Sequence, residues 1–268
     1  MLVSELYFYP IKSMRGIMAD RVTLDERGAR NDRRWMLVDD DGVFISQREA
    51  PRMALIDVLL RGDALLVGAP GMELMRIPLE PEGSPARCTI WSDTVDAVPV
   101  SRTCDDWFSS FLGRPCRLVH MPDTTRRVVD PSRVPHERIV GFADAYPLLI
   151  IGQASLDALN ARLVAAGESP VEMHRFRPNV VVAKAAPHAE DDWRHVRIGS
   201  IDVDVVKPCS RCTIPTVDVD TGVMGKEPLR TLSTYRKQGS KVMFGQNAVH
   251  RRAGSIAVGD PVTVASVA

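Results

Sequence analysis

Residues 35–46 read Trp35-Met36-Leu37-Val38-Asp39-Asp40-Asp41-Gly42-Val43-Phe44-Ile45-Ser46, two apolar runs separated by acidic residues and a glycine. Aspartate followed by glycine favours a tight turn, and the apolar runs on either side favour strands. The segment therefore predicts a β-hairpin, with arms at residues 35–38 and 43–46.

Similar short segments follow one another through the first hundred residues. They predict further strands at residues 2–9, 21–24, 55–60, 64–67, 74–78 and 95–100. Many short strands with few helical periods are typical of a β-barrel or a β-sandwich. Residues 105–113 begin with acidic residues and end with glycine, which predicts a short helix that caps this part of the chain.

The second half of the chain has a different pattern. Residues 121–138 contain three prolines and four arginines without periodicity and predict a connecting loop. Strands are expected at residues 148–152, 179–183, 196–198, 203–207 and 262–264, and helices at 155–166 and from Glu227-Pro228 to Gly239. We predict a mostly β protein of the α+β class, with a β-barrel-like domain at 1–120 and a second β-barrel with a few helices at 121–268.

Composition excludes several classes of function. The 268 residues include 34 Lys plus Arg and 34 Asp plus Glu, so a generally basic surface for nucleic acid or anionic lipid is not expected, and any anion site must be local. The first residues lack a basic region and an apolar core of the kind found in signal peptides. No stretch approaches the roughly 18 apolar residues that cross a bilayer. We expect a cytoplasmic protein without membrane or nucleic-acid partners.

The five cysteines are few and odd in number, which is not typical of a disulfide-stapled secreted domain. We expect reduced thiols. Cys88, Cys104 and Cys116 lie near apolar residues and are predicted to be small core side chains.

Cys209 and Cys212 belong to the segment Lys207-Pro208-Cys209-Ser210-Arg211-Cys212, which places two thiols beside two cations. A structural zinc site would need further Cys or His ligands at compatible spacing. A thiol–disulfide exchange pair would need a helix N-terminus, which Pro215 and the β-branched residues oppose. A single thiolate that binds a soft redox metal needs only one cysteine and a pocket for its cofactor. Spacing alone leaves all three open.

The chain resembles the molybdenum-cofactor MOSC-domain proteins that carry an N-terminal MOSC β-barrel domain. The family includes amidoxime-reducing enzymes and bacterial reductases of N-hydroxylated bases. The motifs that carry the resemblance occur in the same order along nearly the whole chain: Tyr9–Gly16, Asn31–Trp35, Gln47–Arg52, Phe176–Asn179, Lys207–Cys212 and Phe244–Asn247.

The resemblance implies a binding site for the molybdenum cofactor. By position, Cys212 corresponds to the molybdenum ligand, and Cys209 is interpreted as a packed neighbour. The positions expected to contact the pterin, its phosphate or the metal loop are Lys12, Ser13, Arg33, Arg177, Asn179, Ser210, Arg211, Gln246 and Asn247. Lysine, arginine and hydroxyl groups suit a phosphate, and amides suit the edge of a pterin ring. Asp218, Asp220, Thr221 and Gly222 are expected to form a turn rather than a catalytic group.

One segment departs from the mitochondrial relatives. They have small hydroxyl residues before a proline, where this chain has Asp144-Ala145-Tyr146-Pro147. Tyr146 either replaces the cofactor contact through its hydroxyl or simply packs.

The implied activity is reduction of N-hydroxylated compounds such as amidoximes, hydroxylamines and hydroxylaminopurines. Without an iron–sulfur cysteine set, the chain would take electrons from a separate donor protein, of the flavin reductase, ferredoxin or cytochrome type. One alternative is a cofactor carrier or sulfur-handling protein without substrate turnover. Another is a β-rich binding module with a structural metal. The oligomeric state is left open.

Overall fold

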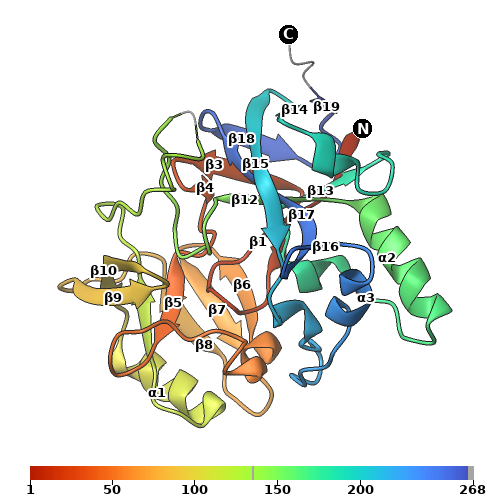
Figure 1. Ribbon diagram of the computed structural model, residues 1–268. Coiled ribbons are helices and arrows are strands. Elements are labelled where there is room, and N and C mark those ends of the chain that lie inside the picture. Colours follow the sequence, from red (N-terminus) through yellow and green to blue (C-terminus); the bar gives the residue numbers. More distant parts are fainter. Residues whose placement is uncertain (135, 265–268) are drawn as a thin grey trace.

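The computed structural model describes residues 1–134 and 136–264, which form four sheets and a few helices (Figure 1). The largest sheet has nine strands. In spatial order eight of them are β19 (Val262–Val264), β14 (His195–Ile198), β15 (Ile201–Ser210), β17 (Lys241–His250), β12 (Leu148–Gly152), β13 (Val180–Ala183), β1 (Leu2–Phe8) and β2 (Ile17–Met18). The ninth, β16 (Lys237–Gln238), pairs with β17.

The three smaller sheets come mostly from the first half of the chain. One has the order β5 (Trp35–Val38), β11 (Arg117–His120), β10 (Asp93–Pro99) and β9 (Ala86–Ile90). Another has the order β6 (Asp57–Arg61), β7 (Ala64–Gly68) and β8 (Met75–Pro78). The third has the order β18 (Gly254–Ala257), β3 (Arg21–Asp25) and β4 (Gly28–Ala29). The prediction of a mostly β fold is confirmed.

Helices cover the two ends of the molecule (Figure 1). The α-helices are α1 (Arg102–Leu112), α2 (Gln153–Ala165) and α3 (Leu229–Ser233), and the 3-10 helices are η1 (Pro51–Leu55), η2 (Met173–Phe176), η3 (Ala189–Asp192) and η4 (Ile214–Thr216). Helix α1 begins earlier than predicted because the side chain of Ser101, rather than Asp105, accepts the capping bond, from the Cys104 amide. In the described ranges, no helix combines the length and the apolar character needed to span a membrane.

The two halves of the chain share strands. Strand β1 pairs antiparallel with β13, with Leu6 opposite Val180, and β18 pairs with β3, with Ile256 opposite Val22. These pairings cross residue 120, so the first strand belongs to the sheet built by the second half. The domain boundary at 120 and 121 stays a prediction, and residues 265–268 of the second predicted domain lie outside the described residues.

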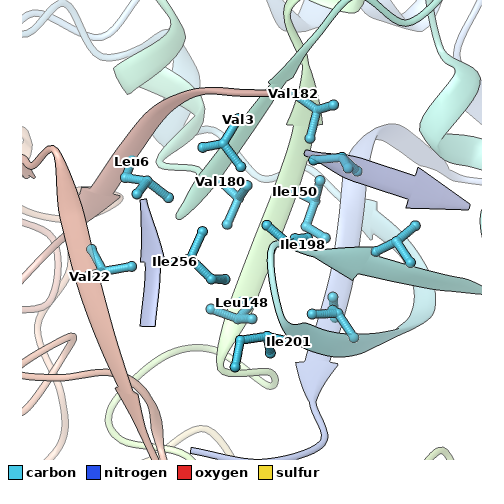
Figure 2. Packing of buried hydrophobic residues seen from close by; sticks show 14 of the residues in the cluster. Val3, Leu6, Val22, Leu148, Ile150, Val180, Val182, Ile198, Ile201 and Ile256 are labelled. Carbon is cyan, nitrogen blue, oxygen red and sulfur yellow. The ribbon is translucent and has the colours of Figure 1, made fainter. Parts of the chain in front are cut away.

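A hydrophobic core joins these strands from both ends of the sequence. Figure 2 shows its apolar side chains, including Leu6 of β1, Leu148 and Ile150 of β12, and Ile256 of β18. Burial of such side chains stabilises the fold by about 1.5–3 kcal/mol each. This core therefore holds the beginning of the chain against the sheet that carries the cysteine segment.

The predicted hairpin at residues 35–46 forms, but its second arm is not a regular strand. The turn is closed by a hydrogen bond from the Gly42 amide to the Asp39 carbonyl, at 3.1 Å. Residues 43–46 make only isolated bridges, and the regular neighbour of β5 is β11, with Trp35 opposite His120. The second arm nevertheless pairs with β5: Val38 bridges Phe44, and the Ile45 amide donates to the Leu37 carbonyl at 2.8 Å.

The predicted helix from Glu227 to Gly239 is also too long. Helix α3 ends at Ser233, and Gly239, with φ 59°, turns the hairpin between β16 and β17 instead. Glycine marks both helix ends and hairpin turns, so its presence alone did not distinguish them.

The predicted loop at residues 121–138 is confirmed, apart from residue 135, which lies outside the described residues. The core cysteines are confirmed as well. Cys88, Cys104 and Cys116 are buried, and burial raises the pKa of each thiol.

Candidate functional site

The cysteine segment lies where β15 ends. Cys209 is within the strand and packs against a hydrophobic cluster, while Cys212 follows the strand and precedes η4. Arg211 places its Nη1 3.1 Å from the Cys209 Sγ and donates from Nη2 to the Phe176 carbonyl at 2.7 Å. The cation thus contacts Cys209 rather than Cys212. Both thiols are free.

The segment separates two adjoining cavities. An inner cavity of about 110 Å³ and an outer cavity of about 470 Å³ share the residues Asp144, Ala145, Cys209, Ser210, Arg211, Cys212 and Asn247. Among the described residues no group of three or more His, Cys, Asp or Glu side chains could hold a metal ion.

Cations from distant parts of the chain line the inner cavity. The ammonium of Lys12, which is 5% exposed, donates to the Phe142 carbonyl at 2.9 Å and to Asp144 Oδ1 at 2.5 Å. Arg33 pairs through Nη1 with Asp32 Oδ2 at 2.6 Å. Arg177 donates to a backbone carbonyl, that of Met14, at 2.5 Å. With Arg211, the cavity has four cations and two paired carboxylates, the local excess of positive charge that an anion site needs.

Tyr9 organises two of these cations. The guanidinium carbons of Arg33 and Arg177 lie 4.5 and 4.2 Å from its ring centroid. Burial, together with the neighbouring charge of Arg33, lowers the pKa of Arg177 to about 10. The two like charges are therefore held close together at a cost, which a bound anion would relieve.

The backbone at these residues is strained. Ser13, Arg33 and Arg177 have φ angles of 66°, 47° and 57°, in the left-handed region that favours glycine. Each such residue costs on the order of 1–3 kcal/mol, and such strain gathers at binding sites. Three of the residues that the sequence motifs selected therefore share a strained backbone beside one cavity.

The predicted amides differ in their placement. Asn179, which is 2% exposed, accepts hydrogen bonds from the Leu149 amide at 3.1 Å and from Arg33 Nη1 at 3.2 Å. It therefore helps to hold Arg33 in place beside the inner cavity. Asn247 lines both cavities. Gln246 lies apart from these amides: it lines neither cavity, and its Nε2 donates to Asp191 Oδ1 at 2.7 Å. Side chains alternate along β17, so only one of these two neighbours can face the cavities.

Asp144, Ala145 and Tyr146 of the segment Asp144-Ala145-Tyr146-Pro147 line the inner cavity. Tyr146 is 6% exposed and packs in a hydrophobic cluster, and the Lys207 ammonium lies 5.1 Å from its ring. Asp144 instead makes the polar contact, through its pair with Lys12. Sequence reasoning also missed Arg48 and Trp91, which line the outer cavity. The only sequence signal for Arg48 was its place in the motif at residues 47–52.

Two family models match the chain. The MOSC N-terminal beta barrel domain matches residues 1–115, and the MOSC domain matches residues 137–263. The chain belongs to the MOSC-domain family. Lys12, Ser13 and Arg33 lie in the MOSC N-terminal beta barrel domain, while Arg177 and Cys212 lie in the MOSC domain. The inner cavity is therefore formed where the two MOSC regions meet.

Similar proteins include mitochondrial amidoxime-reducing components. The chain is 34% identical to component 1 of Homo sapiens, over 97% of this chain and 82% of that protein. It is 33% identical to component 2 of Bos taurus, again over 97% of this chain and 82% of that protein. It is 32% identical to component 1 of Danio rerio, over 97% of this chain and 84% of that protein. The similarity to these MOSC proteins therefore extends through both domains.

Proposed function

We propose that the chain is a molybdenum-cofactor-dependent oxidoreductase that reduces N-hydroxylated compounds, including amidoximes, hydroxylamines and hydroxylaminopurines. The observation that carries the proposal is one cavity that combines a free thiol, Cys212, with an excess of buried and half-buried cations. Membership of the MOSC family and the similarity to proteins named amidoxime-reducing components support the reaction type.

The residues present fit the cofactor. The molybdenum cofactor joins a soft metal, which a thiolate binds well, to a pterin that carries a phosphate. Arg177 Nη2 and Arg211 Nε are buried and have no hydrogen-bond partner within the described residues. A buried donor without a partner costs about 1–3 kcal/mol, so acceptor oxygens and nitrogens on a bound group would stabilise the site.

The roles follow from the positions of the side chains. We assign Cys212 as the metal ligand and Lys12, Ser13, Arg33 and Arg177 as the group that holds the phosphate and pterin. Asn179, Ser210, Arg211 and Asn247 complete the cofactor contacts. Cys209, which packs against the hydrophobic cluster and contacts Arg211, is the neighbouring structural thiol.

When bound, the cofactor supplies the two electrons that break the N–O bond, and a separate donor protein returns them. The N-hydroxyl group takes up two electrons and two protons and leaves an N–H product and water. The outer cavity admits the substrate beside Cys212. Lys207 and Lys241 line it with hydrogen-bond donors that suit the oxygen of an N-hydroxyl group.

A reductase assay tests the proposal. The protein is produced in a host that makes the cofactor, its molybdenum content is measured, and benzamidoxime is added with a chemically reduced artificial donor. We expect benzamidine to form in proportion to the molybdenum content. A fully loaded protein that forms no benzamidine would contradict the proposed reaction and favour the carrier alternative.

A further inference from the structure

Trp91 occupies a backbone position that disfavours it. Ile90 pairs with Asp93, so Trp91 and Ser92 form the two-residue loop between β9 and β10. The φ angle of Trp91 is 56°. Such loops usually take glycine, asparagine or aspartate where φ is positive, and a bulky residue there is a genuine outlier. An outlier of this kind points to a function for the side chain.

The indole lines the outer cavity and is held there by specific contacts. Its Nε1 donates to Asp144 Oδ1 at 3.3 Å, and the Arg48 guanidinium carbon lies 4.5 Å from the ring. The Phe44 ring centroid is 5.0 Å away. Trp91, Arg48 and Cys212 all line this cavity.

Trp91 is also accessible. It is 45% exposed, whereas Trp35, Trp107 and Trp193 are at most 7% exposed. A fixed aromatic ring that keeps nearly half of its surface free can stack with a planar guest, and the guanidinium of Arg48 extends this surface.

The positive charges around the outer cavity favour uncharged planar ligands over positively charged ones. Arg48, Lys207, Arg211 and Lys241 line it, while the carboxylate of Asp144 is already paired with Lys12. A guest with a positive charge would meet repulsion, and a neutral one would not.

We propose that Trp91 and Arg48 form a recognition ledge for the ring of planar, uncharged N-hydroxylated substrates, and that the surrounding cations disfavour a protonated product. The inference rests on the proposed function, which supplies the substrate class. An amidoxime is uncharged at neutral pH, whereas the amidine formed from it is protonated. The same cavity therefore retains the substrate and releases the product.

Tryptophan fluorescence and calorimetry test the ledge on the full-length, cofactor-loaded protein without an electron donor, so that no turnover occurs. Three probes separate the contribution of the aromatic ring to binding from that of a positive charge. They are benzamidoxime, its protonated counterpart benzamidine, and acetamidoxime, which has no ring. We expect benzamidoxime to quench the exposed tryptophan and to bind about tenfold more tightly than either other probe. Equal affinity of benzamidoxime and acetamidoxime would overturn the ledge, and equal affinity of benzamidine would overturn the charge selection.

Substitutions of Trp91 distinguish an effect on substrate binding from an effect on folding stability. Glycine accepts a positive φ, and this relief of strain offsets the lost indole contacts, so Trp91→Gly should change the melting temperature little, yet weaken benzamidoxime binding about tenfold and leave acetamidoxime binding unchanged. Trp91→Phe keeps an aromatic face and should retain most of the affinity. Leu74→Ala, which removes an exposed apolar side chain elsewhere, should change neither. Unchanged benzamidoxime binding in Trp91→Gly would refute the ledge.

The binding experiments and the reductase assay test the recognition ledge and the proposed reaction independently. Ring-dependent binding without turnover in the reductase assay would contradict the proposed reaction while supporting the ledge. Turnover that does not depend on Trp91, measured as KM for benzamidoxime against KM for acetamidoxime, would overturn the ledge and leave the reaction standing.

Discussion

Ser13, Arg33 and Arg177 illustrate what single residues contribute to the site. Their types were predicted from motifs, because lysine, arginine and hydroxyl groups suit an organic phosphate. Their left-handed backbone and the stacking of the two arginines on Tyr9 could not be predicted, since both depend on contacts between residues far apart in the sequence. For a related reason the motif predicted both Gln246 and Asn247 but not that they face different ways along β17, with only Asn247 lining the cavities.

Because Gly16 has no side chain, it leaves room for the ring of Tyr9, on which these arginines stack. A Cβ at Gly16 would lie 2.3 Å from Tyr9 Cε1, and Tyr9 is 1% exposed with little room to move. Gly16→Ala should therefore lower the free energy of unfolding by about 1–3 kcal/mol and reduce molybdenum content. Urea unfolding and metal analysis measure both effects. Gly68→Ala, where the added carbon meets Leu74 at an ordinary 3.6 Å, is the matched control, and an equal loss there would contradict the explanation.

His120 makes folding stability depend on pH. Burial, together with the nearby charge of Arg34, lowers its pKa from 6.5 to about 4. Between about pH 6.5 and pH 4, His120 is protonated in the unfolded chain but neutral in the folded protein. The free energy of unfolding therefore falls as the pH falls through this range. Between pH 7 and pH 4.5 this residue should contribute a loss of about 2 kcal/mol.

His120→Gln removes this proton and tests the assignment. Urea unfolding at pH 7 and pH 4.5 should show a smaller loss for the variant than for the native protein, by about 2 kcal/mol. Equal losses in the two proteins would show that His120 is not the group responsible.

At the scale of elements, the turn after Cys212 shows a prediction that structure confirms. Asp218 Oδ1 accepts from the Asp220 amide at 3.1 Å, and from the amide and hydroxyl of Thr221, both at 2.9 Å. The carboxylate therefore shapes the loop. Asparagine can make similar bonds, so Asp218→Asn should keep activity within about twofold, whereas Asp218→Ala should lose about 1 kcal/mol of stability. Kinetics and thermal unfolding check this, and a large fall in kcat for Asp218→Asn would indicate a chemical role instead.

Element boundaries were predictable where the signal is local. The buried strand at residues 148–152 matches β12, and α1 begins at Arg102, three residues before the expected start at Asp105. The errors occurred where two structures share a signal, as at Gly239, or where a segment pairs too briefly to form a regular strand, as residues 43–46 do beside β5. Trp91 was missed because nothing in its sequence context reveals its backbone angle or its neighbours.

At the scale of the molecule, the cavity depends on pairing between the two ends of the chain. Strand β1 enters the sheet of the second half, and the loop after it carries Lys12 and Ser13 to the cysteine segment. The balanced composition predicted that any anion site would be local, and the cations around the inner cavity agree with that expectation. Family motifs predicted the participants, but only the structure supplies their arrangement.

The central claim is that Cys212 holds molybdenum in this cavity, and metal analysis of three proteins tests it most directly. The native protein, Cys212→Ser and Cys209→Ser are produced in the same cofactor-competent host, and molybdenum per chain is measured by mass spectrometry. We predict that the native protein and Cys209→Ser carry molybdenum and that Cys212→Ser has lost it. Zinc in place of molybdenum, or loss of the metal from Cys209→Ser but not from Cys212→Ser, would contradict the account.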